Sequence, residues 1–286
     1  MEDHIDRLRG GAHISGVEIA IVGAGPAGIS AAVQLKKEGL AFTLFEKGRP
    51  GGLLWYANRV DNLLAHRGRS GKELCRLFDD HLREMGIVIE YTEVRSIEMA
   101  GARFMVNGRD FSHVILATGS SPREVDIPGV LYFIEDEKEL NGKRLLILGG
   151  GDLAYDNALR AANAGGYVTI ARRGEPRANS MLLEEARSAG IREIIADEGG
   201  IIFHGDHYQF GDDMYDLLAV FIGRSPNRGL ISRMGPVEID IPSFSTSVNG
   251  LYVVGDAALG TVSQTALSSG SGLAAAMHIS QMVKER

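Results

Sequence analysis

The chain has 286 residues, of which 44% are hydrophobic and 23% charged; this is ordinary for a globular protein and long enough for about two domains. Its net charge of −7 argues against a nucleic-acid-binding protein, because a phosphate-binding surface shows as a basic excess. No apolar run approaches the ~20 residues that a membrane helix needs, and a single cysteine excludes an internal disulfide and favours the cytoplasm.

The N-terminal part carries a dinucleotide-binding pattern. Residues 1–15 are polar and are expected to form a loose arm, not a secretory signal. Residues 17–22, VEIAIV, predict a short strand, followed by Gly23, Gly25 and Gly28 in the spacing G-x-G-x-x-G and then by a helix. In such a loop the first glycine makes a tight turn, the second lets backbone approach a pyrophosphate, and the third lets helix and strand pack closely. The helix N-terminus adds free N–H groups and a positive dipole end.

Glu46 indicates which dinucleotide this first site takes. A second strand is expected over 42–45, and Glu46 follows it, 18 residues after Gly28. A carboxylate in this place accepts hydrogen bonds from ribose hydroxyls. It therefore favours an adenine dinucleotide whose ribose carries no 2′-phosphate.

The segments that follow are expected to be structural. Residues 71–82, GKELCRLFDDHL, predict an amphipathic helix in which Cys75 is a small core residue. Residues 87–106 alternate apolar and polar side chains and contain Gly101, which is typical of a strand-rich excursion.

A second loop of the same kind lies 126 residues after the first. Residues 145–154, LLILGGGDLA, end a strand and begin a helix. The offset places Gly149, Gly151 and Ala154 on the three glycines of the first loop without a gap. Two such loops in register predict two dinucleotide sites.

The two copies differ where the ribose would bind. The offset places Arg172 where the first copy has Glu46, and the segment TIARRGEPR also carries Arg173 and Arg177. Guanidinium groups in this place favour a 2′-phosphate. The second site is therefore expected to take NADP; the alternative is a solvated basic turn.

The predicted fold is α/β, with two Rossmann-like three-layer nucleotide-binding domains, the second inserted into the first. Strands at 111–122 and 250–260 end in small residues and complete the first domain. The proline- and glycine-containing turns at 126–130 and 234–242 are expected to be the two crossings between the domains. The expected division is an arm at 1–15, a first domain at 16–123 and 238–286, and an inserted domain at 124–237.

The segments GAGPAG, FEKG, ATGSSP, GGGDLA, ARRGEPR, GRSPN and GLYVVGDA occur in this order over residues 16–284 and together resemble the low-molecular-weight thioredoxin reductase family. The resemblance implies an NADPH-dependent flavoprotein oxidoreductase, with FAD in the first domain, NADPH in the inserted domain, and a homodimeric assembly. It implies that Asp256 meets the ribitol chain and that Gln264 and Thr265 lie near the flavin pyrimidine edge. Asn62 matches a flavin-contacting asparagine, although the proline and glycine usual after it are missing.

The resemblance implies two sets of binding residues, and no catalytic side chain, because the flavin carries the chemistry. The FAD-binding residues are Gly23, Gly25, Pro26, Ala27, Gly28, Glu46, Lys47, Gly52, Leu53, Asn62, Thr118, Gly119, Gly255, Asp256, Gln264 and Thr265. The NADP-binding residues are Gly149, Gly151, Asp152, Ala154, Arg172, Arg173 and Arg177. No metal site is expected, because the eight histidines show no metal-ligand spacing, and His204 with His207 is expected in a solvated turn.

The stretch before the second glycine loop departs from the thioredoxin reductases. Those enzymes carry a Cys-x-x-Cys there, whereas this chain reads LYFIEDEKELNGKRLLILGGG. The stretch instead resembles the thioredoxin reductase-like ferredoxin–NADP reductases, which implies ferredoxin, flavodoxin or a small molecule as the electron acceptor. Two alternatives stay open: a disulfide or thioredoxin reductase that uses cysteines of a partner chain, and a non-catalytic FAD-binding or redox-sensor protein.

Overall fold

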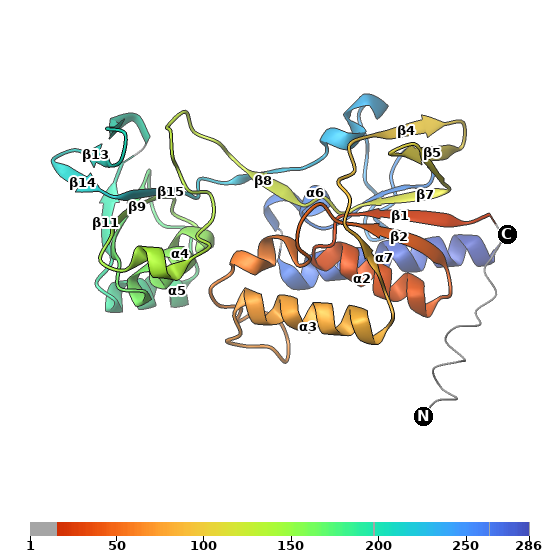
Figure 1. Cartoon of the computed structure of the whole chain (residues 1–286), viewed down its shortest axis with the longest axis horizontal. Coiled ribbons are helices and arrows are strands. Elements are labelled where there is room, and N and C mark those ends of the chain that lie inside the picture. Colours follow the sequence, from red (N-terminus) through yellow and green to blue (C-terminus); the bar gives the residue numbers. More distant parts are fainter. Residues whose placement is uncertain (1–15, 197, 263, 286) are drawn as a thin grey trace.

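Two parallel β-sheets lie towards opposite ends of an elongated molecule and are connected by a pair of short antiparallel strands (Figure 1). The computed structural model describes residues 16–196, 198–262 and 264–285. The expected arm at 1–15 lies outside the described residues. We call the part that contains the N-terminal strand the first unit, and the part inserted into it the second unit.

The first unit has three layers. Its central sheet is parallel, with the strand order β17-β7-β1-β2-β3. Helices α2, α3 and α7 cover one face, and the antiparallel sheet β4-β5-β6 covers the other (Figure 1). The bounds are β1 Glu18–Val22, α2 Pro26–Lys37, β2 Ala41–Phe45, α3 Gly71–Glu84, β3 Ile89–Glu90, β4 Ile97–Ala100, β5 Arg103–Val106, β6 Arg109–Phe111, β7 His113–Leu116, β17 Leu251–Val253 and α7 Thr265–Lys284.

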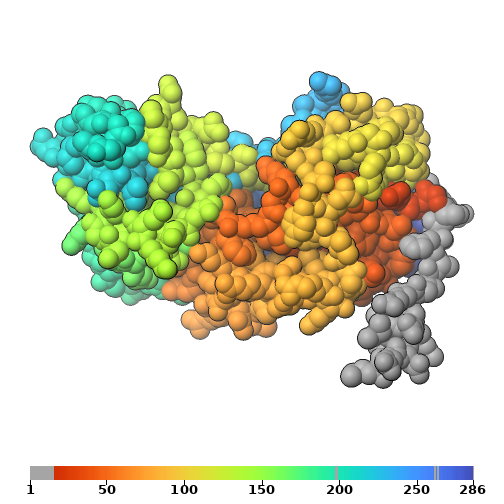
Figure 2. Space-filling model, in the orientation of Figure 1, coloured from red at the N-terminus to blue at the C-terminus, as the bar shows by residue number. Residues whose placement is uncertain are grey.

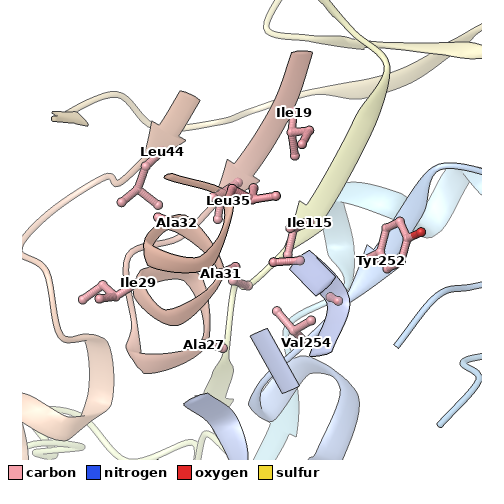
Figure 3. Close-up of a cluster of buried hydrophobic side chains, with 14 of the residues drawn as sticks. Ile19, Ala27, Ile29, Ala31, Ala32, Leu35, Leu44, Ile115, Tyr252 and Val254 are labelled. Carbon is pink, nitrogen blue, oxygen red and sulfur yellow. The ribbon is translucent and has the colours of Figure 1, made fainter. Parts of the chain in front are cut away.

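The alternation of side chains along β1 explains the two outer layers. Ile19 and Ile21 join a buried cluster with α2 and α7 (Figure 3), whereas Ala20 and Val22 join a cluster with the β4-β5-β6 sheet. None of the four is more than 5% exposed. A parallel strand that is buried on both faces reads as a continuous apolar run, and the segment VEIAIV therefore predicted this strand.

The contact between α2 and α7 depends on a glycine. A Cβ on Gly272 would lie 1.9 Å from the carbonyl oxygen of Ala27, whereas a Cβ on Gly270 of the same helix would meet no atom within 4 Å. Gly272→Ala should therefore push the helices apart and lower the free energy of unfolding by about 3 kcal/mol. Gly270→Ala should raise it by roughly 0.5–1 kcal/mol, because alanine is the better helix former. Chemical denaturation checks both values, and equal destabilisation by the two changes would contradict the packing argument.

The second unit repeats the arrangement of the first. Its parallel sheet has the order β11-β10-β9-β15. Helices α4 and α5 pack on one face of this sheet, and the antiparallel strands β12-β13-β14 pack on the other. The bounds are β9 Arg144–Leu148, α4 Asp152–Asn163, β10 Tyr167–Arg172, α5 Ser180–Ser188, β11 Arg192–Ile195, β12 Ile201–Phe203, β13 Tyr208–Phe210, β14 Asp213–Tyr215 and β15 Leu217–Val220.

The offset of 126 residues is confirmed by the element bounds. Strand β1 and helix α2 recur as β9 and α4, with first residues 18 and 26 shifted to 144 and 152. The glycines that follow the two helices, Gly39 and Gly165, both adopt left-handed φ angles, +71° and +87°. The two glycine loops therefore occupy the same place in two copies of one strand–helix–strand motif.

The chain crosses between the units in two short strands, β8 (Ser120–Pro122) and β16 (Arg224–Pro226), which pair antiparallel. The expectation that 126–130 and 234–242 are the crossings is wrong. Val125, Ile127 and Val130 pack into the second unit, whereas Ile231, Met234, Val237 and Ile239 pack into the first. The inserted unit therefore runs from about 123 to 223, so the expected boundary at 237 lies too late.

The remaining elements are short. They are the 3₁₀ helices Gly52–Tyr56, Glu137–Leu140, Glu198–Gly200, Gly229–Met234 and Gly260–Val262, and the helix α6, Asp256–Leu259. Within the described part of the chain, no helix combines the length and the apolar character of a membrane span.

Candidate functional site

The first glycine loop has the geometry of a pyrophosphate cradle. A Cβ on Gly23 would lie 2.5 Å from the carbonyl oxygen of Ala117, and a Cβ on Gly28 would lie 1.9 Å from that of Gly23. Both glycines are therefore required by packing. Gly25 has an ordinary φ of −76°, and a Cβ on it would meet no atom within 4 Å. The space in front of Gly25 is open, next to Pro26, which begins α2.

In the second glycine loop, as in the first, one glycine is required by packing and another faces open space. A Cβ on Gly149 would lie 2.5 Å from the carbonyl oxygen of Phe221, which follows β15 as Ala117 follows β7. A Cβ on Gly151 would meet no atom within 4 Å. The third position holds a fully buried alanine, Ala154, so helix and loop are far enough apart here for one methyl group.

Glu46 closes the first loop from the end of β2. Its Oε2 accepts the Ala24 N–H at 2.7 Å, and its Oε1 accepts the Gly48 N–H at 2.9 Å. A carboxylate offers about four lone-pair sites, so both oxygens can still accept further hydrogen bonds. Lys47, the next residue, is exposed.

The segment after β2 folds back onto the first loop. Gly51 donates its N–H to the Ala24 carbonyl at 2.7 Å. A Cβ on Gly52 would lie 3.3 Å from Gly25 Cα. Gly52 and the half-buried Leu53 therefore line the edge of the same open space as Gly25. Ala27, by contrast, is 4% exposed and contributes backbone and packing.

Asp256 lies at the centre of a polar network at the carboxyl end of β17. Its Oδ2 accepts the Ser120 hydroxyl at 3.0 Å, and its Oδ1 accepts that of Ser268 at 3.1 Å. Arg224 donates to Ser120 Oγ at 3.0 Å, and burial lowers the pKa of this arginine against the raising effect of Asp256. Gly255 lies just before Asp256, and a Cβ on it would lie 3.0 Å from Ala27 Cβ.

Two further pairs bring expected FAD-binding residues together across the chain. Asn62 donates its side-chain N–H to Gln264 Oε1 at 2.8 Å, although 202 positions separate them. Thr265 follows Gln264 as the first residue of α7. Thr118 donates its hydroxyl to the carbonyl of Asn227, and Gly119 accepts the Asn227 N–H at 2.9 Å. Like Asp256 and Glu46, Thr118 and Gly119 follow the carboxyl ends of parallel strands, where ligands bind in open α/β sheets.

The second site is a cationic pocket of about 280 Å³ at the carboxyl ends of β9 and β10. Its lining residues are Leu148, Gly149, Gly150, Ala171, Arg172, Arg173, Gly174, Glu175, Arg177, Ala196, Phe221 and Ile222. Arg173 and Arg177 are exposed. The three arginines that were expected to hold a 2′-phosphate therefore share one pocket with the glycine loop.

Arg172 is held by a neighbour on β11. Its Nε donates to Glu193 Oε2 at 2.8 Å, and its Nη1 donates to the carbonyl of Gly174. Burial, and then the Glu193 carboxylate, raise the pKa of the adjacent Tyr155 to about 12. Asp152, also expected to bind NADP, accepts the N–H of Asn179 at 2.8 Å through Oδ1.

The stretch before the second glycine loop packs against the first unit. The Phe133 ring stacks on Tyr56, with ring centroids 4.2 Å apart. Glu135 accepts the Tyr56 hydroxyl at 3.2 Å and pairs with Arg49 at 3.5 Å. Lys72 donates to the Glu135 carbonyl at 3.3 Å. Figure 2 shows the green second unit directly against the orange segment of the first.

A second contact between the units involves two carboxylates of α4 and α5. Asp156 Oδ2 accepts the Asn58 N–H at 2.9 Å. Glu185 forms a bidentate pair with Arg59, at 2.8 and 3.0 Å, while Arg59 Nε donates to Asp61 at 2.6 Å. We call Asn58, Arg59, Asp156 and Glu185 the clasp.

The model of the pyridine nucleotide-disulphide oxidoreductase family matches residues 17–276. The chain belongs to this family. The expected α/β fold and the expected enzyme class are thereby confirmed, and the non-catalytic alternative finds no support in a family of enzymes.

Two curated relatives and one solved structure illustrate the similarity. Thioredoxin reductase of Bacillus subtilis is 26% identical over 305 residues, covering 94% of this chain and 95% of that protein. Glucosaminate ammonia-lyase of Pseudomonas fluorescens is 26% identical over 300 residues, covering 91% and 93%. The crystal structure of Lactococcus lactis thioredoxin reductase matches with a TM-score of 0.82 at 24% identity, covering 94% of this chain and 100% of that one. The chain is thus a thioredoxin reductase-like flavoprotein oxidoreductase, an enzyme class that uses FAD and NADPH.

The residues present fit these two cofactors of the family. The open space at Gly25 and the carboxylates of Glu46 and Asp256 suit the pyrophosphate, ribose and ribitol of FAD. The open space at Gly151 and the arginine-lined pocket suit NADPH. Among the described residues, no cluster of histidine, cysteine, aspartate and glutamate could hold a metal ion. His204 and His207 stack in the turn between β12 and β13.

Several polar residues of these sites were missed by sequence reasoning. Ser120, Ser268 and Arg224 support Asp256, and Glu193 holds Arg172. The segment GRSPN was noted for its resemblance, yet nothing in it pointed to a contact between Arg224 and Ser120. Each partner lies on a different strand or helix, so no local spacing signals these pairs.

Proposed function

We propose that this enzyme oxidises NADPH and passes the electrons through FAD to an external acceptor, without a redox disulfide of its own. Residues 131–140 carry the proposal. They contain no cysteine, and they contact the first unit through Phe133 and Glu135. When bound, FAD supplies the electron relay between nicotinamide and acceptor.

Cys75 does not suit a redox role. It is 2% exposed and packs with Leu54, Val60 and Leu74. Burial raises the pKa of its thiol to about 12, so the reactive thiolate is scarce at neutral pH. This is the environment of a small core residue, as expected from the sequence.

The chain's own residues have binding and orienting tasks in this proposal. Gly23, Gly25 and Gly28 cradle the FAD pyrophosphate, and Glu46 holds its adenosine ribose. Asp256, whose two carboxylate oxygens each accept a serine hydroxyl, receives the ribitol hydroxyls. The Asn62–Gln264 pair borders the flavin, and the N-terminus of α7 stabilises negative charge there.

NADPH binding falls to the second unit. The N–H groups at the start of α4 receive the pyrophosphate across Gly151, and Arg172, Arg173 and Arg177 receive the 2′-phosphate. The acceptor is a ferredoxin- or flavodoxin-like protein or a small molecule that approaches the flavin edge. We place the enzyme in the cytoplasm as a homodimer.

Cys75→Ser should leave flavin reduction and turnover unchanged. The measurement is NADPH oxidation with thioredoxin, ferredoxin, flavodoxin and a quinone in parallel. We expect turnover with a one-electron protein or the quinone, and none above background with thioredoxin. Turnover with thioredoxin alone, lost in Cys75→Ser, would refute the proposed electron path.

A disulfide reductase that borrows cysteines from a partner chain is the second candidate. It is favoured by the names of the relatives, several of which are thioredoxin reductases. The same screen separates the two candidates. Thioredoxin reduction that persists in Cys75→Ser, but occurs only when a further protein with a redox-active dithiol is added to the assay, would support the second candidate.

A further inference from the structure

The clasp concentrates many polar contacts on two adjacent residues of the first unit. Asn58 gives its backbone N–H to Asp156, and Arg59 binds Glu185 through two nitrogens. Bidentate pairs of arginine and carboxylate are directional as well as strong. The clasp therefore fixes the angle between the units and not only their distance.

The charges of the clasp depend on Arg59. The carboxylates of Glu185 and then Asp61 hold the pKa of Arg59 above its usual range. Burial raises the pKa of Asp156, while the backbone N–H groups of Asn58 and Arg59 lower it. Without the guanidinium group, the carboxylates of Asp61 and Glu185, one from each unit, would lose the positive charge that they share.

The clasp connects the two expected cofactor sites. Asp156 lies on α4, whose N-terminus is the expected pyrophosphate site of NADPH, four residues after Asp152. On the other side, Asn62 follows Asn58 by four residues and bonds to Gln264 at the expected flavin edge. The units are also linked by the contacts of Phe133 and Glu135 with the first unit, and by the two-strand connection of β8 and β16.

We propose that Asp156 and Glu185 are positioning residues for hydride transfer: by holding Asn58 and Arg59 they orient the NADPH-binding unit towards the flavin. The proposal rests on the proposed function. Neither carboxylate lines the arginine pocket, so they act on the approach of the nicotinamide and not on the affinity for NADPH.

Glu185→Gln and Arg59→Gln, each in the FAD-loaded enzyme, test the inference. Both should lower the limiting rate of flavin reduction at saturating NADPH about tenfold and change the Kd of NADPH by less than twofold. Because the two residues act through one contact, the double variant should be no slower than the slower single variant. Glu184→Gln is the matched control, since Glu184 is the exposed neighbour on the same helix, and it should behave as wild type.

A structural readout accompanies the rates. Trp55 is the single tryptophan of the chain and lies under Arg49, 4.7 Å from guanidinium carbon to ring centroid, beside the boundary. Loss of the clasp should shift Trp55 emission and increase the radius of gyration measured by X-ray scattering, without NADPH present.

The outcomes distinguish failure of the proposed function from failure of the inference about the clasp. A wild-type flavin that NADPH does not reduce would refute the proposed function, while emission and scattering would still show whether the clasp orients the units. Wild-type rates and wild-type scattering in Glu185→Gln and Arg59→Gln would overturn the inference. So would an equal loss in Glu184→Gln, or a rate loss fully explained by weaker NADPH binding.

Discussion

Gly25→Val should yield a folded protein that is colourless and takes up no FAD. The backbone at Gly25 is unstrained and the space before it is open, so valine is tolerated by the fold. That open space is where the pyrophosphate is expected, and a branched side chain there would block its approach. We expect FAD affinity to fall on the order of a hundredfold or more, which corresponds to about 3 kcal/mol. Flavin absorbance after incubation with excess FAD measures the effect.

Gly28→Ala is the matched control for this prediction. Its Cβ would lie 1.9 Å from the Gly23 carbonyl oxygen, so it should impair folding itself, which circular dichroism and thermal unfolding detect. Gly25→Val with a wild-type melting temperature and a full complement of FAD would contradict the assignment of the first loop.

Arg172→Ala should weaken NADPH binding by roughly ten- to a hundredfold and leave NADH binding nearly unchanged. Charge-assisted hydrogen bonds contribute about 1.5–3 kcal/mol each, and about 1.4 kcal/mol is a factor of ten. The 2′-phosphate is the group that distinguishes the two dinucleotides, and Arg172 lines the pocket expected to receive it. Equilibrium titration with NADPH, NADH and 2′,5′-ADP measures the three affinities.

Arg192→Ala provides the control for Arg172. Arg192 lies on β11 next to Glu193 but pairs with Asp213, at 2.7 Å, away from the pocket. Its removal should leave both affinities unchanged. Equal losses for NADPH and NADH in Arg172→Ala would show that the ion pair with Glu193 serves folding.

The glycine loops were predictable from the sequence because their function depends on backbone conformations and close contacts that only glycine allows. Gly23 and Gly149 each need a left-handed φ, +106° and +146°, and a close approach that any side chain would prevent. Such demands fall on single positions at fixed spacing, so they survive in the sequence as a pattern. The same is true of the buried strand and helix that flank each loop.

The crossings were not predictable in the same way. Proline and glycine at 126–130 and 234–242 signal turns, but a turn carries no information about which hydrophobic core it joins. Ile231 and Val130 look alike in sequence, yet one packs into the first unit and the other into the second. The clasp was hidden for a related reason: Arg59 and Glu185 are 126 positions apart, and the strength of their pairing arises only when the two units meet.

The two-strand connection makes the second unit an exchangeable module. The chain enters and leaves it at adjacent points: Arg123 donates its N–H to the Gly223 carbonyl at 3.0 Å, and Asn227 donates to Gly119 at 2.9 Å. Splicing at Arg123 and Gly223 would preserve Ser120 and Arg224, and with them the support of Asp256. A module taken from a relative could be grafted at these two points to change the electron donor while the flavin-binding scaffold stays intact, provided that its α4 and α5 carry carboxylates that match Asn58 and Arg59.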